Sequence, residues 1–194
     1  MIAIIDYNAG NATSLQNVLA KMGESSVITA RHDVIRDAER VIFPGVGEAS
    51  SAMNYLKKEG LDQLIKGLKQ PFLGICLGMQ LMCRSSEEGQ TDCLGIFETK
   101  VKLFPALDIV PHNGWNNITV GNTRIFKEVG QAPDVYFIHS YYAELCDQTI
   151  AECDYILPFS AALQKDNFYG TQFHPEKSAQ TGRIILENFI KINK

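Results

Sequence analysis

One apolar segment in the first half of the chain constrains the fold most. Residues 71–75 consist of proline, glycine and large apolar residues with no polar alternation, which is typical of a central strand that is buried on both faces of a parallel sheet. A helical pattern over 77–84 begins almost directly after it. Strands that alternate with helices imply right-handed crossover connections. The segment therefore predicts an α/β fold.

The rest of the chain fits this class. Strands are predicted from short apolar runs at 2–5, 27–29 and 40–43, and later at 101–104, 136–138, 161–164 and 171–173. A turn is predicted at 7–11, and helices at 13–22, 49–58, 61–69 and 181–190. We expect a largely parallel central sheet flanked by helices, with a β-rich second half. No linker, charge block or repeat divides the chain, which indicates one domain over 1–194.

The charge balance excludes several classes of partner. Lysine and arginine number 18 against 22 aspartates and glutamates, so the chain lacks the basic surplus that binds nucleic acid or anionic lipid. No apolar run approaches the roughly 18 residues of a membrane span, and the first residues carry no basic segment. We expect a cytoplasmic protein with neither a nucleic-acid nor a membrane partner.

Cysteine and histidine usage argues against disulfides and metals. The five cysteines include no C-x-x-C pair, and the four histidines have no metal-binding spacing. The sequence therefore predicts no metal and no cofactor. Thiols in a reducing compartment are either buried or reactive.

One thiol lies in a reactive setting. Cys76 is the centre of a G-x-nucleophile-x-G motif, Gly74–Gly78, at the predicted strand-to-helix junction. The crowded turn of such an elbow tolerates only small residues two positions away on either side. A helix that begins at Leu77 directs its positive end at the sulfur and offers its first N–H to an oxyanion. The remaining cysteines lack this setting, and we predict them to be structural: Cys83, Cys93, Cys146 and Cys153.

A base for this nucleophile is offered near the C-terminus. His174 is followed two residues later by Glu176, and Pro175 between them fixes its own φ, so the carboxylate can reach the imidazole and hold its tautomer. The order Cys, His, Glu differs from the Ser, Asp, His order of α/β-hydrolases, which disfavours that family. The Pro44–Gly47 segment follows a strand and could bring N–H groups to an anion. It matches neither a dinucleotide fingerprint nor a P-loop.

Two aromatic segments leave two interpretations open. Residues 112–116 contain Trp115, and 136–142 contain three tyrosines, a phenylalanine and a histidine. Their rings could pack in the core, and their polar tips also suit an interface.

Three motifs together resemble the triad-type, class I glutamine amidotransferases: Pro44–Gly47, Gly74–Gln80 and Phe173–Glu176. With 111–116 and 136–141 added, the resemblance covers essentially the whole chain and extends to the glutaminase subunits of imidazole glycerol phosphate synthase. Those subunits usually have methionine where Asn113 stands.

The resemblance implies a role for each motif. Cys76 attacks the glutamine side-chain amide to form a thioester, His174 protonates the departing ammonia and then activates water, and Glu176 orients His174. The oxyanion donors are the Leu77 N–H and the Val46 backbone. Glutamine is held by Gly47, Gln80, Glu88, Ser140 and Tyr141. The partner interface contains His112, Trp115, Asn116, Tyr136 and Lys177.

The resemblance also implies a partner. Ammonia passes to a cyclase subunit, a (β/α)8 barrel, in a heterodimer that forms imidazole glycerol phosphate and an aminoimidazole carboxamide ribotide in histidine biosynthesis. Two alternatives stay open: a glutaminase subunit of a sugar-modifying amidotransferase, and a stand-alone γ-glutamyl cysteine hydrolase. A non-catalytic regulatory subunit is a weaker alternative, because such a subunit need not keep the triad complete.

Overall fold

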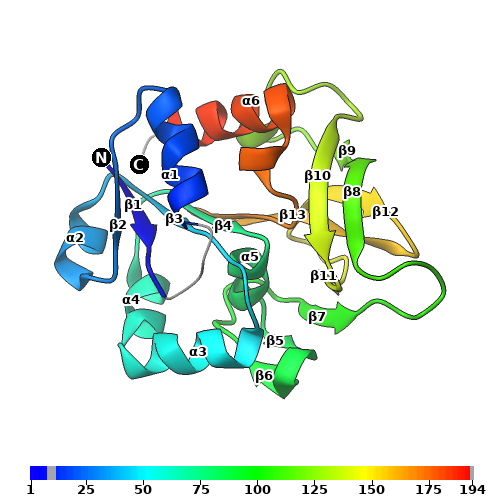
Figure 1. The fold of residues 1–194 in the computed structure, drawn as a ribbon, viewed down its shortest axis with the longest axis horizontal. Coiled ribbons are helices and arrows are strands. Elements are labelled where there is room, and N and C mark those ends of the chain that lie inside the picture. Colours follow the sequence, from blue (N-terminus) through cyan, green and yellow to red (C-terminus); the bar gives the residue numbers. More distant parts are fainter. Residues whose placement is uncertain (8–11, 193–194) are drawn as a thin grey trace.

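A mixed eight-stranded sheet forms the centre of the molecule (Figure 1). The structure is a computed structural model that describes residues 1–7 and 12–192. The strands lie side by side in the order β2 (Ser26–Thr29), β1 (Ile2–Ile5), β3 (Arg40–Phe43), β4 (Phe72–Ile75), β14 (Phe168–Thr171), β13 (Pro158–Lys165), β12 (Thr149–Asp154) and β9 (Thr119–Val120). The first five strands of this order are parallel, and the remaining pairs are antiparallel. The predicted α/β class and the central place of the 71–75 segment are confirmed.

Helices cover both faces of this sheet. Figure 1 shows α1 (Ala12–Lys21) and α6 (Ala179–Ile190) on one side, with α3 (Ala49–Lys58), α4 (Leu61–Gly67) and α5 (Leu77–Met82) on the other. The short α2 (His32–Asp37) packs with the second group through Ile35. Successive residues of β1 alternate between the two cores: Ile2 and Ile4 join the cluster under α1 and α6, whereas Ala3 and Ile5 join the other. Burial on both faces explains the absence of polar alternation.

Two small sheets lie beside the main one. The first pairs β8 (His112–Asn117) with β10 (Asp134–His139), antiparallel. The second has the order β11 (Tyr141–Ala143), β7 (Lys100–Leu103), β5 (Ser85–Ser86) and β6 (Thr91–Asp92). The described part of the chain also forms the 3-10 helices η1 (Glu88–Gln90), η2 (Arg124–Phe126) and η3 (Pro175–Lys177). The predicted β-rich second half is thus divided among three sheets.

The main error of the sequence-based prediction concerns the strand at 171–173. β14 ends at Thr171, so residues 172–173 already belong to the loop that follows it. The 112–117 segment, for which no strand was predicted, forms β8, and β12 was also missed. Gly23, which follows the predicted helix over 13–22, has the left-handed backbone, φ 83°, that is typical of a helix C-terminus. Residues 8–11 of the predicted turn lie outside the described residues.

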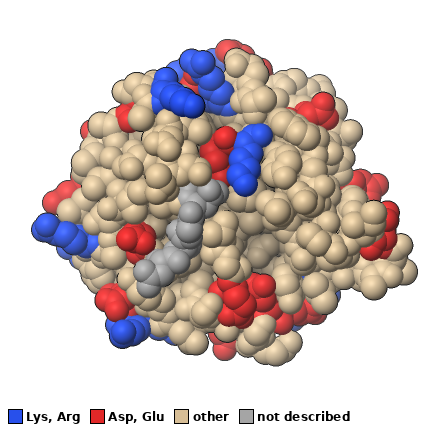
Figure 2. Space-filling view, viewed as in Figure 1, with Lys and Arg blue, Asp and Glu red and all other residues tan. Residues whose placement is uncertain are grey.

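The surface carries both signs of charge. On the face shown in Figure 2, acidic and basic side chains form small groups, some of them side by side, and no continuous basic area occurs there. Among the described residues, no helix is both long and apolar enough to cross a bilayer.

A close approach of backbones fixes the start of α5. A Cβ added at Gly78 would collide with the carbonyl oxygen of Phe43, the last residue of β3. We predict that Gly78→Ala lowers the free energy of unfolding by about 1–3 kcal/mol, because an added methyl group must force the two backbones apart. Urea denaturation measures this difference.

The matched control is Gly67→Ala at the end of α4, where an added Cβ meets nothing within 4 Å. Alanine has the better helix propensity, so this variant should be as stable as the parent or more stable by up to about 1 kcal/mol. Equal destabilisation by the two substitutions would contradict the steric explanation.

Candidate active site

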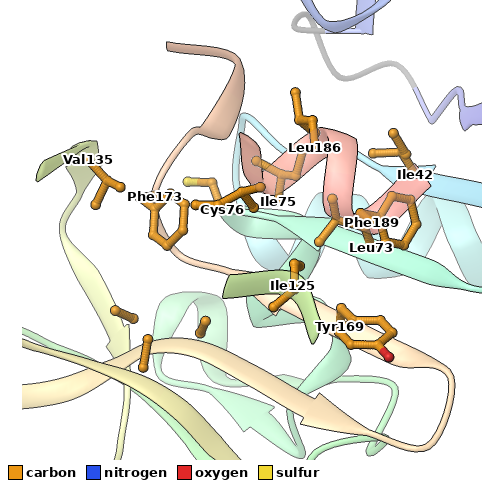
Figure 3. Close-up of a cluster of buried hydrophobic side chains, with 14 of the residues drawn as sticks. Ile42, Leu73, Ile75, Cys76, Ile125, Val135, Tyr169, Phe173, Leu186 and Phe189 are labelled. Carbon is orange, nitrogen blue, oxygen red and sulfur yellow. The ribbon is translucent and has the colours of Figure 1, made fainter. Parts of the chain in front are cut away.

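Cys76 occupies the sharp turn between β4 and α5. Its backbone has φ 53° and ψ −114°, a conformation that non-glycine residues rarely adopt. Two backbone hydrogen bonds hold it there: the Cys76 N–H donates to the Thr171 carbonyl at 2.7 Å, and the Gln80 N–H donates to the Cys76 carbonyl at 3.1 Å. Figure 3 shows Cys76 at the end of the strand that carries Ile75, close to Phe173. The predicted nucleophile elbow is present.

The glycine on the strand side of the elbow is required by space. A Cβ at Gly74 would lie 2.6 Å from the Met82 sulfur and 2.9 Å from the Gly78 carbonyl carbon. Such distances are shorter than van der Waals contact, so a larger residue would displace α5 from β4. The elbow therefore depends on the two glycines of the motif.

His174 lies in the loop after β14 and is held from both ends. Its N–H donates to the Tyr136 carbonyl at 2.9 Å, and the Ser178 hydroxyl donates to its carbonyl at 2.7 Å. The ring Nδ1 lies 2.8 Å from Glu176 Oε1, and both side chains are almost fully buried. The carboxylate accepts a hydrogen bond from the Nδ1–H, which fixes the tautomer and leaves Nε2 for the sulfur.

Nε2 of His174 is buried and lies beside Cys76, although the two side chains do not form a well-aligned hydrogen bond. Burial lowers the pKa of His174, but the interactions with Cys76 and Glu176 outweigh it, so the pKa is raised above its usual value. The site thus favours a proton on the imidazole, which interacts with both Cys76 and Glu176. A protonated imidazole in this place can give its proton to a leaving group after the sulfur has attacked.

A cavity of about 370 Å³ opens in front of the sulfur. It is lined by Cys76 and His174, by both residues expected to supply oxyanion donors, Val46 and Leu77, and by the whole set expected to bind glutamine: Gly47, Gln80, Glu88, Ser140 and Tyr141. A larger cavity of about 640 Å³ between residues 120 and 131 contains none of these groups. We therefore place the candidate site in the smaller cavity. The described residues include no group of three or more side chains suited to a metal ion.

Gln80 has only part of its amide available to a ligand. Its Nε2 donates to the Tyr141 carbonyl at 2.8 Å and to Gln172 Oε1 at 2.9 Å. An amide nitrogen has two protons, so both are used and only the accepting oxygen is left. Glu88 adds a carboxylate whose pKa is raised by burial, and its Oε2 accepts a hydrogen bond from the Ala49 N–H at 2.8 Å.

Two buried histidines lie in contact at the cavity, and one of them, His139, belongs to its lining. His139 Nδ1 lies 2.7 Å from the Tyr141 carbonyl, which can only accept, so the proton is on Nδ1. His139 Nε2 then accepts from His112 Nδ1 at 3.1 Å, and His112 Nε2 faces the Asn116 amide nitrogen at 3.4 Å. Burial lowers the pKa of His139 to about 3 and that of His112 to about 4. Both rings are therefore neutral at pH 7.

Sequence reasoning missed His139 and Gln172. Their only signal was position, since His139 lies one residue before Ser140 and Gln172 lies two residues before His174. The expected interface residues also differ in exposure. Trp115 is 55% exposed and Lys177 is exposed, whereas His112 is 4% exposed. The Trp115 and Tyr136 rings lie 6.0 Å apart, and the Lys177 ammonium lies 5.8 Å from the Tyr136 ring.

Residues 3–192 match the family of class-I glutamine amidotransferases. The chain belongs to this family. It is 55% identical over 194 residues to the imidazole glycerol phosphate synthase subunit HisH of Bacteroides thetaiotaomicron. This alignment covers 98% of this chain and 99% of the relative. It is 43% identical over 195 residues to a HisH 2 subunit of Legionella pneumophila, with 99% and 98% covered.

The fold agrees with this membership. A solved glutamine amidotransferase superposes with a TM-score of 0.74 at 16% identity, over 97% of this chain and 99% of the other. The expected class I glutamine amidotransferase fold is therefore confirmed, and so is the expectation of an amidotransferase enzyme related to the HisH subunits.

The neutral histidine pair predicts a pH dependence. The folded-state pKa values lie below the unfolded value of about 6.5, so acid protonates the unfolded chain first. When the pH falls from 7 to 5, we expect the free energy of unfolding to decrease by about 2 kcal/mol for each ring. In NMR spectra, the ring signals of His112 and His139 should keep the same chemical shifts from pH 7 down to about pH 5. Titration of either ring near its unfolded pKa would contradict the tautomer assignment.

Proposed function

We propose that this chain hydrolyses glutamine to glutamate and ammonia through a thioester on Cys76, and that it delivers the ammonia to a cyclase subunit of imidazole glycerol phosphate synthase. The observation that carries the proposal is the elbow cysteine, with the His174–Glu176 pair, at the mouth of one cavity. The names of the relatives support the choice of synthase.

The first half of the reaction forms the thioester. The Cys76 sulfur attacks the side-chain amide carbon, and the C=O electron pair moves to oxygen. The Leu77 N–H, at the positive end of α5, and the Val46 backbone stabilise this oxyanion. When the C–N bond breaks, His174 transfers its proton to the nitrogen, and ammonia leaves.

The second half releases glutamate. His174, now neutral, removes a proton from water, and the resulting hydroxide attacks the thioester carbon. The C–S bond breaks, and the sulfur leaves as a thiolate beside the reprotonated imidazole. Glu176 stabilises the imidazolium at both stages without giving up a proton.

The cavity offers matching partners for the rest of glutamine. Glu88 and the oxygen of Gln80 can only accept, so they suit the α-ammonium group and amide N–H groups. Ser140, Tyr141 and Gly47 line the same space and can donate to the carboxylate.

The partner in this proposal is a (β/α)8-barrel cyclase, which forms a heterodimer with this chain. In the heterodimer, residues 1–194 act as one domain, and the complex works in the cytoplasm. Trp115, Asn116, Tyr136 and Lys177 would contact it. His112 is buried, so it would act through the Asn116 amide beside it rather than by direct contact.

We predict that Cys76→Ala lowers the rate of glutamine-dependent synthesis in the complex by about a thousandfold or more, because the covalent route is lost. Synthesis from added ammonia should persist, since the cyclase does not need the sulfur. Cys146→Ala, on a half-buried thiol outside the cavity, is the control and should keep glutamine-dependent synthesis. A Cys76→Ala complex that still used glutamine at the parent rate would refute the thioester.

The isolated chain should be a poor glutaminase that the loaded partner activates. Val46 is 39% exposed and precedes Gly47, whose φ is 116°, so its peptide can reorient at little steric cost. Turning this N–H toward the substrate would complete the oxyanion hole, which is worth about a hundred- to thousandfold in rate. The effect is measured by comparing three glutaminase rates: that of the chain alone, that with empty cyclase, and that with cyclase plus an acceptor analogue. Full activity of the chain alone would favour the stand-alone hydrolase.

A further inference from the structure

Gln172 contacts the Cys76 sulfur but does not line the substrate cavity. Its side chain is completely buried, and its Nε2 lies 3.7 Å from Cys76 Sγ. Its Oε1 accepts from Gln80 Nε2 at 2.9 Å. A buried amide of this kind has a fixed set of partners, so the direction of each hydrogen bond can be worked out.

The direction is set by the Tyr141 carbonyl, which can only accept. Gln80 must therefore turn its nitrogen toward Tyr141, and its second proton then points at Gln172. Because Gln80 donates, Gln172 must present its oxygen there, which leaves its NH2 group facing the sulfur. The opposite amide orientation would set two acceptors against each other at Gln80 and Tyr141.

We propose that Gln172 is a positioning residue that donates a hydrogen bond to the Cys76 sulfur, holds it in place for attack and favours its thiolate form. The proposal rests on the role of Cys76 as the nucleophile. A donor stabilises a charged acceptor more than a neutral one, so the Gln172 amide acts with His174 rather than as a spacer in the core.

The other groups around the sulfur do not supply this interaction. The Ile138 carbonyl lies 3.8 Å from Sγ and can only accept, so it favours the thiol. Tyr7 interacts electrostatically with Cys76, but its hydroxyl donates a hydrogen bond to the Pro44 carbonyl at 2.7 Å. The other titratable groups that line the cavity are His174, His139, Glu88 and Tyr141. Of these, His174 interacts directly with Cys76.

The test compares Gln172→Met with Gln172→Glu in the full chain. Methionine keeps the volume without a donor, and glutamate keeps the acceptor for Gln80 but sets an oxygen against the sulfur. The readout is the pH midpoint of Cys76 alkylation by iodoacetamide, followed by peptide mass spectrometry. We expect Gln172→Met to raise the midpoint by about half to one pH unit, the effect of one lost hydrogen bond, and Gln172→Glu to raise it further.

Gln70→Met is the matched control. Gln70 is also buried, precedes β4 at the end opposite Cys76, and donates to the Ile35 carbonyl at 2.9 Å. It should lose stability without moving the midpoint. In complex with the cyclase, Gln172→Met should lower kcat for glutamine about tenfold with little change in KM, because Gln172 does not line the cavity. Faster alkylation of the buried Cys83 and Cys153 would reveal unfolding.

An unchanged midpoint in folded Gln172→Met would overturn the proposal. If neither variant folds, NMR of the parent chain decides it: the Gln172 NH2 signals should shift with the midpoint of the Cys76 thiol, and pH-independent signals would overturn the proposal. Failure of the proposed function would give a different result, because Cys76→Ala would then keep glutaminase activity whatever residue stands at Gln172.

Discussion

The site depends on a steric constraint, the contact of three backbone segments with almost no space between them. The end of β3, the end of β4 and the first turn of α5 meet at Gly45, Gly74 and Gly78, where an added Cβ would collide with a neighbouring backbone or side chain. This contact accompanies the positive φ of Cys76 and packs Gly45 of the Pro44–Gly47 loop against the start of α5. Nucleophile and loop are therefore placed by packing rather than by attraction between them.

Strand order then brings in the base. β14 is parallel to β4, with Thr171 opposite Ile75, so the two strands end at the same edge of the sheet. Residues that follow parallel neighbouring strands lie close together at that edge, and this is why His174 reaches Cys76 across almost a hundred positions of sequence. One bond, from the Cys76 N–H to the Thr171 carbonyl, fixes the register on which their separation depends.

The local parts of this arrangement were readable from the sequence, and the parts that depend on register were not. The elbow at Cys76 and the His174–Glu176 pair are short-range patterns with a steric or electrostatic reason. β14 was placed too late, since the structure has Gly170 inside the strand, where the absence of a side chain leaves room for Met79. The pairing of His112 with His139 depends on how β8 and β10 align, which no local pattern specifies.

The Tyr141 carbonyl ties these long-range contacts together, because it accepts from both His139 and Gln80. One hydrogen-bonded chain leads from it to the Cys76 sulfur, and the other leads through His112 to the half-buried Asn116. Each link has one allowed proton direction, so these chains are rigid supports and not two-state elements. Coupling between distant sites requires an element with two arrangements. The Pro44–Gly47 loop meets this requirement best, because Val46 and Gly47 are exposed, and a rigid network around the sulfur confines any change to the oxyanion side of the cavity.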